Sequence, residues 1–179
     1  MNNMDTTTVI SDAIKINSDD IIYVNKDSTL FLSNLSNVTL SLLINNKWIT
    51  RQLPYDFNNS KIEISYNDFN NDKIPEIIFK IVNDEHITYG DTHTEYLAIF
   101  DYNKMFFLFK RLTNSKSSHY SYNSKKDLWN NEDYDYFNLP IKIEKDKLII
   151  GKAEGEIGET KIAPGTYKLT NNKWCPIDQ

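Results

Sequence analysis

The stretch Lys61–Val82, KIEISYNDFNNDKIPEIIFKIV, decides how the fold is interpreted. Apolar and polar residues alternate from Ile62 to Tyr66, and an apolar run begins at Ile77. Both patterns are typical of β-strands, and the Asn- and Asp-rich segment between them is typical of a tight connection. The stretch therefore predicts two strands joined by a polar loop.

Short runs of β-branched and aromatic residues recur along the rest of the chain, separated by turns rich in asparagine. No run of ten or more residues in the sequence follows the 3.6-residue period of a helix. The fold class that this pattern predicts is all-β, an antiparallel sandwich or a small irregular β domain with little helix. We expect strands at Ile21–Val24, Thr29–Ser33, Val38–Ile44, Trp48–Leu53, Lys61–Tyr66, Glu76–Val82, Glu95–Asp101, Lys104–Arg111, Ile141–Glu144, Lys147–Gly151 and Thr166–Thr170.

Composition excludes several classes of protein. The chain has 179 residues, of which 40% are hydrophobic, enough to build one packed domain and too many for a disordered protein. The net charge of −5 and the lack of a basic stripe argue against a nucleic-acid partner. No apolar stretch is long enough for a transmembrane helix, and Cys175 alone cannot form an internal disulfide.

The amino-terminal segment bears on domain organisation and location. We expect a polar leader over 1–19, one β domain over 20–179 and a long aromatic-rich insertion at about 113–139. The leader resembles the stretch that follows the lipid-bearing cysteine of bacterial lipoproteins. This resemblance implies a periplasmic or outer-surface lipoprotein if a signal has been removed, with membrane contact only through a lipid anchor. Read literally, the chain is cytoplasmic.

Oxygen-bearing side chains recur at every second position in the connecting loop. Calcium binds about six to eight oxygen ligands, and alternate residues of a tight loop can converge on one ion. A backbone carbonyl two residues after the third side chain normally completes such a set. The sequence therefore predicts a calcium site made by Asp68, Asn70, Asp72, the carbonyl of Ile74, and Glu76. The simpler alternative is an Asx-rich turn without an ion.

This loop and its flanking strands resemble one copy of the FG-GAP or VCBS-type calcium repeat. That family has a strand, then D-x-N-G-D-G-x-x-D, then an apolar strand, and its side-chain ligands align with Asp68, Asn70, Asp72 and Glu76. The resemblance covers about 61–82. It departs at the two glycines, which are Asn71 and Lys73 here; Lys73 in a left-handed conformation would add strain and bring a cation near the ion.

A second candidate site lies in the segment His119–Leu139, where aromatic residues alternate with Asp, Asn and Ser. Mixed tyrosine, tryptophan and small polar residues are typical of recognition surfaces, and they would also suit stacking on sugars. The alternative is a long connection that folds its aromatic side chains onto the core. The predicted partner-binding residues are Tyr120, Tyr122, Trp129, Tyr134 and Tyr136.

No enzyme motif is present in the sequence. His86 and His93 lie near acidic residues in Asn83–Thr94 and could hold zinc together with them. No H-x-x-x-H or comparable spacing fixes the two histidines on one face, and we expect an exposed polar hairpin loop there. Motifs of serine hydrolases, zinc proteases and phosphate-binding loops are missing from the sequence as well. We therefore expect a protein that is not an enzyme.

The functional hypothesis combines the residues with the resemblance. Small single-motif relatives of FG-GAP proteins include periplasmic inhibitors and immunity-type proteins. The resemblance thus implies a calcium-braced β protein that binds and neutralises a partner protein, such as a cell-wall hydrolase or a toxin. The alternative is a carbohydrate-binding module of the cell envelope.

Overall fold

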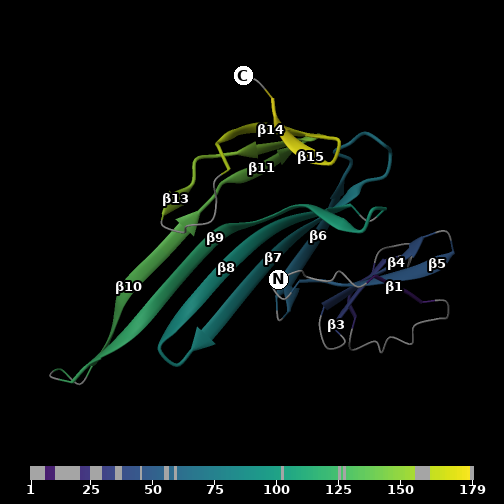
Figure 1. The fold of residues 1–179 in the computed structure, drawn as a ribbon. Helices are drawn as coiled ribbons and strands as arrows, with labels where there is room; N and C mark the ends of the chain where they lie inside the picture. Colours follow the sequence, from purple (N-terminus) through teal and green to yellow (C-terminus); the bar gives the residue numbers. More distant parts are fainter. Residues whose placement is uncertain are drawn as a thin grey trace. The chain divides into compact units, whose positions relative to one another are not determined.

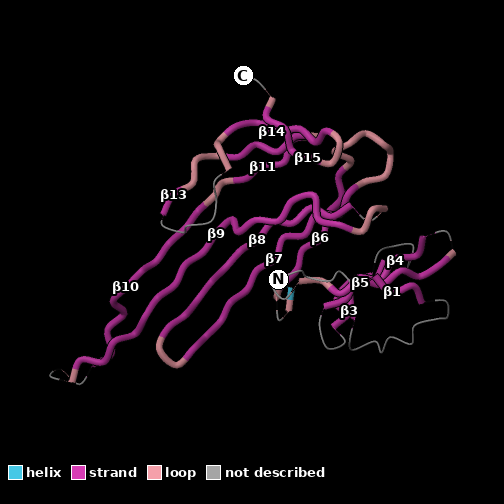
Figure 2. Tube along the Cα trace, viewed as in Figure 1, coloured by secondary structure: helices cyan, strands magenta, loops and turns pink. Residues whose placement is uncertain are grey.

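The all-β prediction is confirmed. A computed structural model describes residues 7–10, 21–24, 30–34, 38–44, 46–54, 57–58, 60–101, 103–124, 126, 128–155 and 162–177 (Figures 1 and 2). Across these residues the strands form three sheets, and the strand pairs are antiparallel. This described part of the chain contains no helix with the length and apolar character that crossing a membrane requires.

Contacts divide the chain into two compact units, residues 1–59 and 60–179. Our sequence-based boundaries did not include this division. The first unit contains sheet A, in which Leu30 pairs with Leu42 and Leu32 with Leu40, so that these buried leucines share one face. Sheet A has the order β1-β5-β4-β3-β2, formed by β1 (Thr7–Ile10), β2 (Ile21–Val24), β3 (Leu30–Asn34), β4 (Val38–Ile44) and β5 (Lys47–Gln52). β1 lies within the predicted polar leader.

The second unit contains two sheets. Sheet B has the order β13-β10-β9-β8-β7-β6, formed by β6 (Lys61–Asn67), β7 (Glu76–Ile87), β8 (Gly90–Asp101), β9 (Phe106–Asn123), β10 (Leu128–Asn138) and β13 (Glu154–Gly155). Sheet C has the order β11-β12-β14-β15, formed by β11 (Ile141–Glu144), β12 (Lys147–Ile150), β14 (Gly165–Thr170) and β15 (Lys173–Pro176).

Sheets B and C pack together as a sandwich around one apolar core. Sheet B contributes Ile78, Ile99 and Phe109, and sheet C contributes Leu148 and Leu169. Each of these side chains is buried, and burial of apolar surface of this kind is the main favourable term in folding. This core holds together the part of sheet B that packs on sheet C. Both candidate sites are built on strands or connections of sheet B.

Three strands are longer than predicted. β7 runs on to Ile87, β8 starts at Gly90, and β9 continues to Asn123. The polar hairpin loop that we expected over Asn83–Thr94 is therefore wrong, because this segment is paired strand up to a short turn. The predicted insertion at 113–139 consists mostly of the outer parts of β9 and β10. Both faces of these outer strands are polar, so the apolar alternation that marks a half-buried strand is missing.

Candidate functional site

The predicted calcium loop connects β6 to β7. The two strands pair up to Asn67 and Glu76, which leaves 68–75 as the connection. Asp68 holds the start of the turn, because its Oδ1 accepts the Asp72 backbone N–H at 3.2 Å and its Oδ2 accepts the Lys73 N–H at 3.0 Å. Asp72 Oδ1 in turn accepts the N–H of Ile74 at 2.8 Å. These bonds fold the loop so that its acidic side chains turn back toward its own backbone.

Asn70 connects the middle of this loop to its last acidic residue. Its Oδ1 accepts the Asp72 backbone N–H at 2.8 Å. Its Nδ2 donates to Asp72 Oδ2 at 3.0 Å and to Glu76 Oε1 at 2.8 Å. The amide group thus brings together oxygens of two predicted ligands. A calcium ion in the loop would need Asn70 to present Oδ1 to that space, because an amide N–H cannot bind a cation.

The loop backbone has the shape that the aligned glycines would give it. Asn71 has φ of 59° and Lys73 has φ of 70°, both in the left-handed region. These are the two positions at which the sequence departs from the family pattern. Asparagine tolerates this conformation better than lysine, whose Cβ adds strain of about 1 kcal/mol. Both residues therefore adopt the left-handed conformation, and the backbone strain falls mainly on Lys73.

Glu76 is the most deeply buried acidic residue of the loop, with 2% of its surface exposed. Its Oε2 accepts the backbone N–H of Phe69 at 2.9 Å. Burial raises the pKa of Glu76, and the negative charges of Asp101 and Asp72 add to this rise. No cationic side chain among the described residues forms an ion pair with Glu76. The loop therefore contains a buried carboxylate whose charge a bound cation would stabilise.

A second buried acidic residue lies at the end of β8 and forms an ion pair with a lysine of the same chain. Asp101 is buried, and its Oδ2 accepts the ammonium of Lys104 at 2.8 Å. The same ammonium donates to Asn172 Oδ1 at 2.9 Å, on the turn between β14 and β15. This hydrogen bond to Asp101 raises the pKa of Lys104, to which Asp72 and Glu76 contribute at longer range. Asp101 is thus neutralised within the chain, in contrast to Glu76.

The remaining predicted ligand, Ile74, lies at the exposed rim of the loop. Across the described residues, no three His, Cys, Asp or Glu side chains are gathered closely enough to hold a metal ion in this arrangement. The oxygen-bearing side chains of Asp68, Asn70, Asp72 and Glu76 have the chemistry that a calcium ligand requires. Binding of an ion would require side chains of the loop to rotate. The Asn70 amide in particular would have to turn its oxygen toward Asp72 and Glu76, where its Nδ2 now lies.

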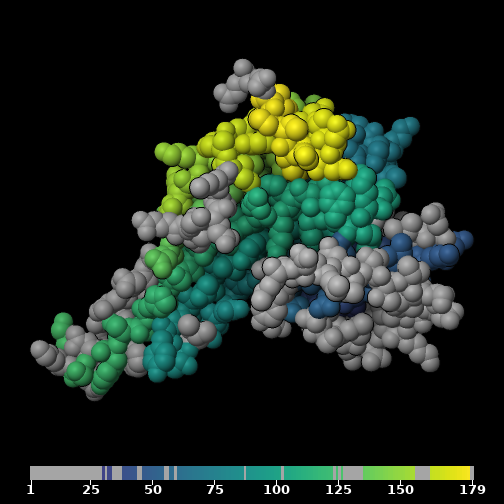
Figure 3. Space-filling model, viewed as in Figure 1, coloured from purple at the N-terminus to yellow at the C-terminus, as the bar shows by residue number. Residues whose placement is uncertain are grey.

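The predicted partner-binding tyrosines lie at the outer end of sheet B. β8 ends its pairing with β9 at Gly90 and His119, and β9 and β10 continue beyond it as a two-stranded ribbon (Figure 1). Tyr122 and Tyr136 are exposed, by 49% and 42%, and Tyr120 is half-buried. In Figure 3 the described atoms of this ribbon (green) extend beyond the body of the sandwich. Tyr122 and Tyr136 therefore contribute exposed aromatic surface to this part of sheet B.

The other two predicted residues of this surface are placed only by the backbone. Trp129 pairs with Tyr122, and Tyr134 pairs with Ser118. Their side chains lie outside the described set. Tyr136 donates a hydrogen bond from its hydroxyl to Glu154 Oε2 at 2.7 Å, which joins β10 to β13 and raises the pKa of Tyr136. The sequence could not show this contact because it depends on the pairing of β13 with β10.

Sequence reasoning noted His86 and His93 but missed that each pairs with an aspartate on the neighbouring strand of the same sheet. The β7–β8 register places Asp84 opposite His93 and His86 opposite Asp91. His93 Nδ1 lies 2.6 Å from Asp84 Oδ1, and His86 Nδ1 lies 2.7 Å from Asp91 Oδ1. The pKa of each histidine is raised chiefly by its hydrogen bond to the opposite aspartate.

This cluster joins the tyrosine surface through Asp91, which also accepts the hydroxyl of Tyr120. That bond, followed by the one to His86, lowers the pKa of Asp91. The alternation of His and Asp in NDEHITYGDTHT was the available signal. This alternation predicts the His–Asp pairs only once both segments are known to be paired strands with these side chains on one face.

Comparison with protein-family models, with curated proteins and with solved structures gave no match. The class that the fold defines is an antiparallel all-β protein whose second unit is a sandwich. The FG-GAP resemblance accordingly stays a prediction from the residues of one loop.

Proposed function

We propose that this chain is a calcium-braced β protein that recognises another protein through the outer end of sheet B. The observation that carries the recognition surface is the pair of exposed tyrosines on β9 and β10: Tyr122 lies on the ribbon, and Tyr136 lies opposite Lys116, where β9 still pairs with β8. Tyrosine contributes a large contact area at low cost in side-chain entropy. A ribbon anchored at its base in a sandwich core would present these rings in a largely preformed arrangement.

Calcium would act in this proposal as a structural brace. Asp68, Asn70, Asp72 and Glu76 would hold the ion with side-chain oxygens, and Ile74 with its carbonyl. The buried Glu76 carboxylate supports this part, because a divalent cation would reverse the unfavourable effect of burial on its charge. Phe69, which lies within the loop, is fully buried in the sandwich core, so that ordering the loop would stabilise the core as well.

The kind of partner follows from the resemblance. We propose that the chain neutralises a cell-wall-degrading enzyme or a toxin, as an inhibitor or immunity-type protein in the periplasm or on the outer surface. The acidic and aromatic composition of the ribbon supports a partner with a basic site. The proposed role is binding alone, without catalysis by this chain.

The test is capture of a partner by the full chain and by matched tyrosine variants. Tyr122→Ala with Tyr136→Ala removes the two exposed aromatic rings that the structure describes on β9 and β10. Tyr66→Ala is the control, because Tyr66 on β6 is exposed by 42%, the same fraction as Tyr136. We expect a partner that is retained by the wild type and by the control and lost by the double variant. Backbone amide protection confined to β9 and β10 in the complex would locate the contact.

A partner whose footprint lies on sheet C or on the first unit would contradict the proposed surface. A carbohydrate-binding module would behave differently in the same experiment. Soluble glycans would then protect the ribbon and shift the tryptophan emission in the wild type, and no protein would be retained. That result would replace the protein partner with a sugar at the same tyrosines.

A further inference from the structure

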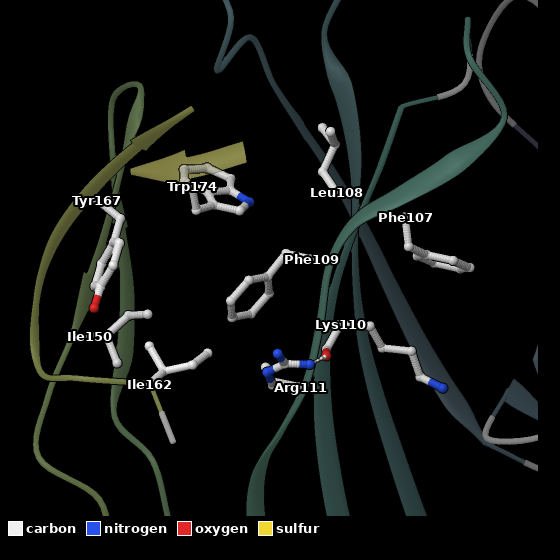
Figure 4. A pocket seen from close by; sticks show the side chains of 9 residues that line it. All are labelled: Phe107, Leu108, Phe109, Lys110, Arg111, Ile150, Ile162, Tyr167 and Trp174. Atoms are coloured by element: carbon white, nitrogen blue, oxygen red, sulfur yellow. Dashed lines mark hydrogen bonds between the residues drawn. The ribbon is translucent and has the colours of Figure 1, made fainter. Parts of the chain in front are cut away.

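A partly open cleft of about 450 Å³, lined by both apolar and polar surface, lies in the second unit, away from the tyrosine surface. Phe109 on β9, Ile150 on β12 and Trp174 on β15 contribute to its walls, with Tyr167 and Ile162. Figure 4 shows Phe109 and Arg111 pointing from β9 toward the sheet C residues, whereas Phe107 and Lys110 point away. The cavity has a volume typical of sites that bind small molecules, which are about 300–1,000 Å³.

The aromatic walls are held in place by their own contacts. The Trp174 ring meets Phe109 at 6.4 Å and Phe69 at 5.1 Å between centroids, both edge to face. The Tyr167 hydroxyl donates to the Ala163 carbonyl at 2.6 Å. The indole N–H of Trp174 is buried and has no acceptor among the described residues. The cavity is thus preformed, and its wall contains one hydrogen-bond donor that is not satisfied.

The charged residues that line the cavity are both cations. The ammonium of Lys110 lies 5.8 Å from the centre of the Tyr96 ring and is directed away from the cavity. Arg111 is exposed, and its guanidinium donates to the neighbouring Lys110 carbonyl at 3.0 Å. No carboxylate among the described residues forms an ion pair with Arg111. In a chain with a net charge of −5, this cleft combines aromatic and aliphatic side chains with a guanidinium, and its described lining contains no acidic residue.

We propose that this cavity binds a small apolar carboxylate, such as a medium-chain fatty acid or an aromatic acid. The hydrocarbon part lies among Phe109, Ile150 and Trp174, where its transfer from water is favourable. The carboxylate lies at Arg111, whose planar guanidinium matches two carboxylate oxygens. This site is independent of the proposed function, since it shares no residue with the tyrosine surface or the calcium ligands.

The experiment titrates the full-length chain with decanoate and with decanol, which has a chain of the same length and no charge. Binding is followed by calorimetry and by the indole N–H resonance of Trp174, assigned with Trp174→Phe. Arg111→Gln removes the charge that faces the cavity. Lys116→Gln is the matched control, because Lys116 is an exposed cation of the same strand that does not line the cavity.

We expect decanoate to bind more tightly than decanol to the wild type and to shift the Trp174 resonance. Arg111→Gln should weaken decanoate binding about tenfold and abolish its advantage over decanol, and Lys116→Gln should leave both unchanged. Failure of decanoate to bind below its aggregation concentration would overturn the proposal. Equal affinity of the wild type and Arg111→Gln for decanoate would overturn it as well. Neither result would affect partner capture by the ribbon.

Discussion

Phe69 packs edge to face against Trp174, with ring centroids 5.1 Å apart and an interplanar angle of 79°. Phe69 lies between two of the proposed calcium ligands, and Trp174 lies on β15 of the opposite sheet. The contact therefore ties the β6–β7 loop to the core of the sandwich. The order of this loop and the stability of the second unit should depend on each other.

Removal of this contact should be costly. Phe69 is fully buried, so Phe69→Ala should lower the free energy of unfolding by about 3–5 kcal/mol through lost burial and a residual cavity. Chemical denaturation followed by circular dichroism measures the loss. Tyr122→Ala, at an exposed ring of the ribbon, should change the stability by less than about 0.5 kcal/mol. Similar effects of the two substitutions would mean that Phe69 is not a core residue.

Relief of backbone strain at Lys73 should improve the loop. Lys73 has φ of 70°, and glycine adopts this conformation without a steric penalty. Lys73→Gly should raise the stability by up to about 1 kcal/mol and tighten calcium binding, because it also removes a positive charge near the ion. Lys61→Gly, in the paired strand β6, should instead destabilise the chain. A loss of stability in Lys73→Gly would contradict the described loop conformation.

The histidine–aspartate pairs predict a defined pH dependence. The hydrogen bond with Asp84 raises the pKa of His93, and the same bond lowers the pKa of Asp84. The contribution of His93 is fully present below its unfolded value of about 6.5 and is lost as the pH rises through its higher folded value. The contribution of Asp84 is present above its unfolded value of about 3.9 and is lost as the pH falls through its lower folded value.

Titration of the histidine ring protons by NMR checks this assignment. Asp84→Asn should move the midpoint of His93 down toward about 6.5, since the partner charge is removed. Asp91→Asn should move His86 in the same direction and leave His93 nearly unchanged, because His86 has Asp91 as its main partner. An unchanged midpoint of His93 in Asp84→Asn would rule out the pair in solution.

Several strands of both units could be predicted from local sequence patterns. The bounds of β4 and β11 match their predicted ranges because apolar alternation ends there at asparagine-rich or charged turns. β9 was predicted too short because its outer half is polar on both faces, so neither periodicity nor hydrophobicity distinguishes it from a loop. Its strand character comes from hydrogen bonding to β8 and β10, which local sequence does not encode.

The candidate sites also differ in whether local sequence is enough to predict them. The proposed calcium ligands lie within one short stretch, so the spacing of Asp68, Asn70 and Asp72 was enough to propose a site. The pairing of His93 with Asp84 required the register of two strands. The cleft depends on Arg111 of sheet B and Trp174 of sheet C lying close together, and a single sequence contains no signal for that.

The most direct test of the calcium brace is thermal unfolding of the full chain in calcium and in EDTA. A ligand that binds only the folded state at about a hundredfold excess over its Kd adds about 2.7 kcal/mol, or about 5–10 °C in Tm. We expect such a shift in the wild type and in Glu63→Gln, an exposed acidic residue of β6. Asp72→Asn, which keeps an oxygen acceptor for Ile74 and loses the charge, should abolish most of it. An equal Tm of the wild type in calcium and in EDTA would contradict the brace and leave Asp68–Glu76 as a turn held by its own hydrogen bonds.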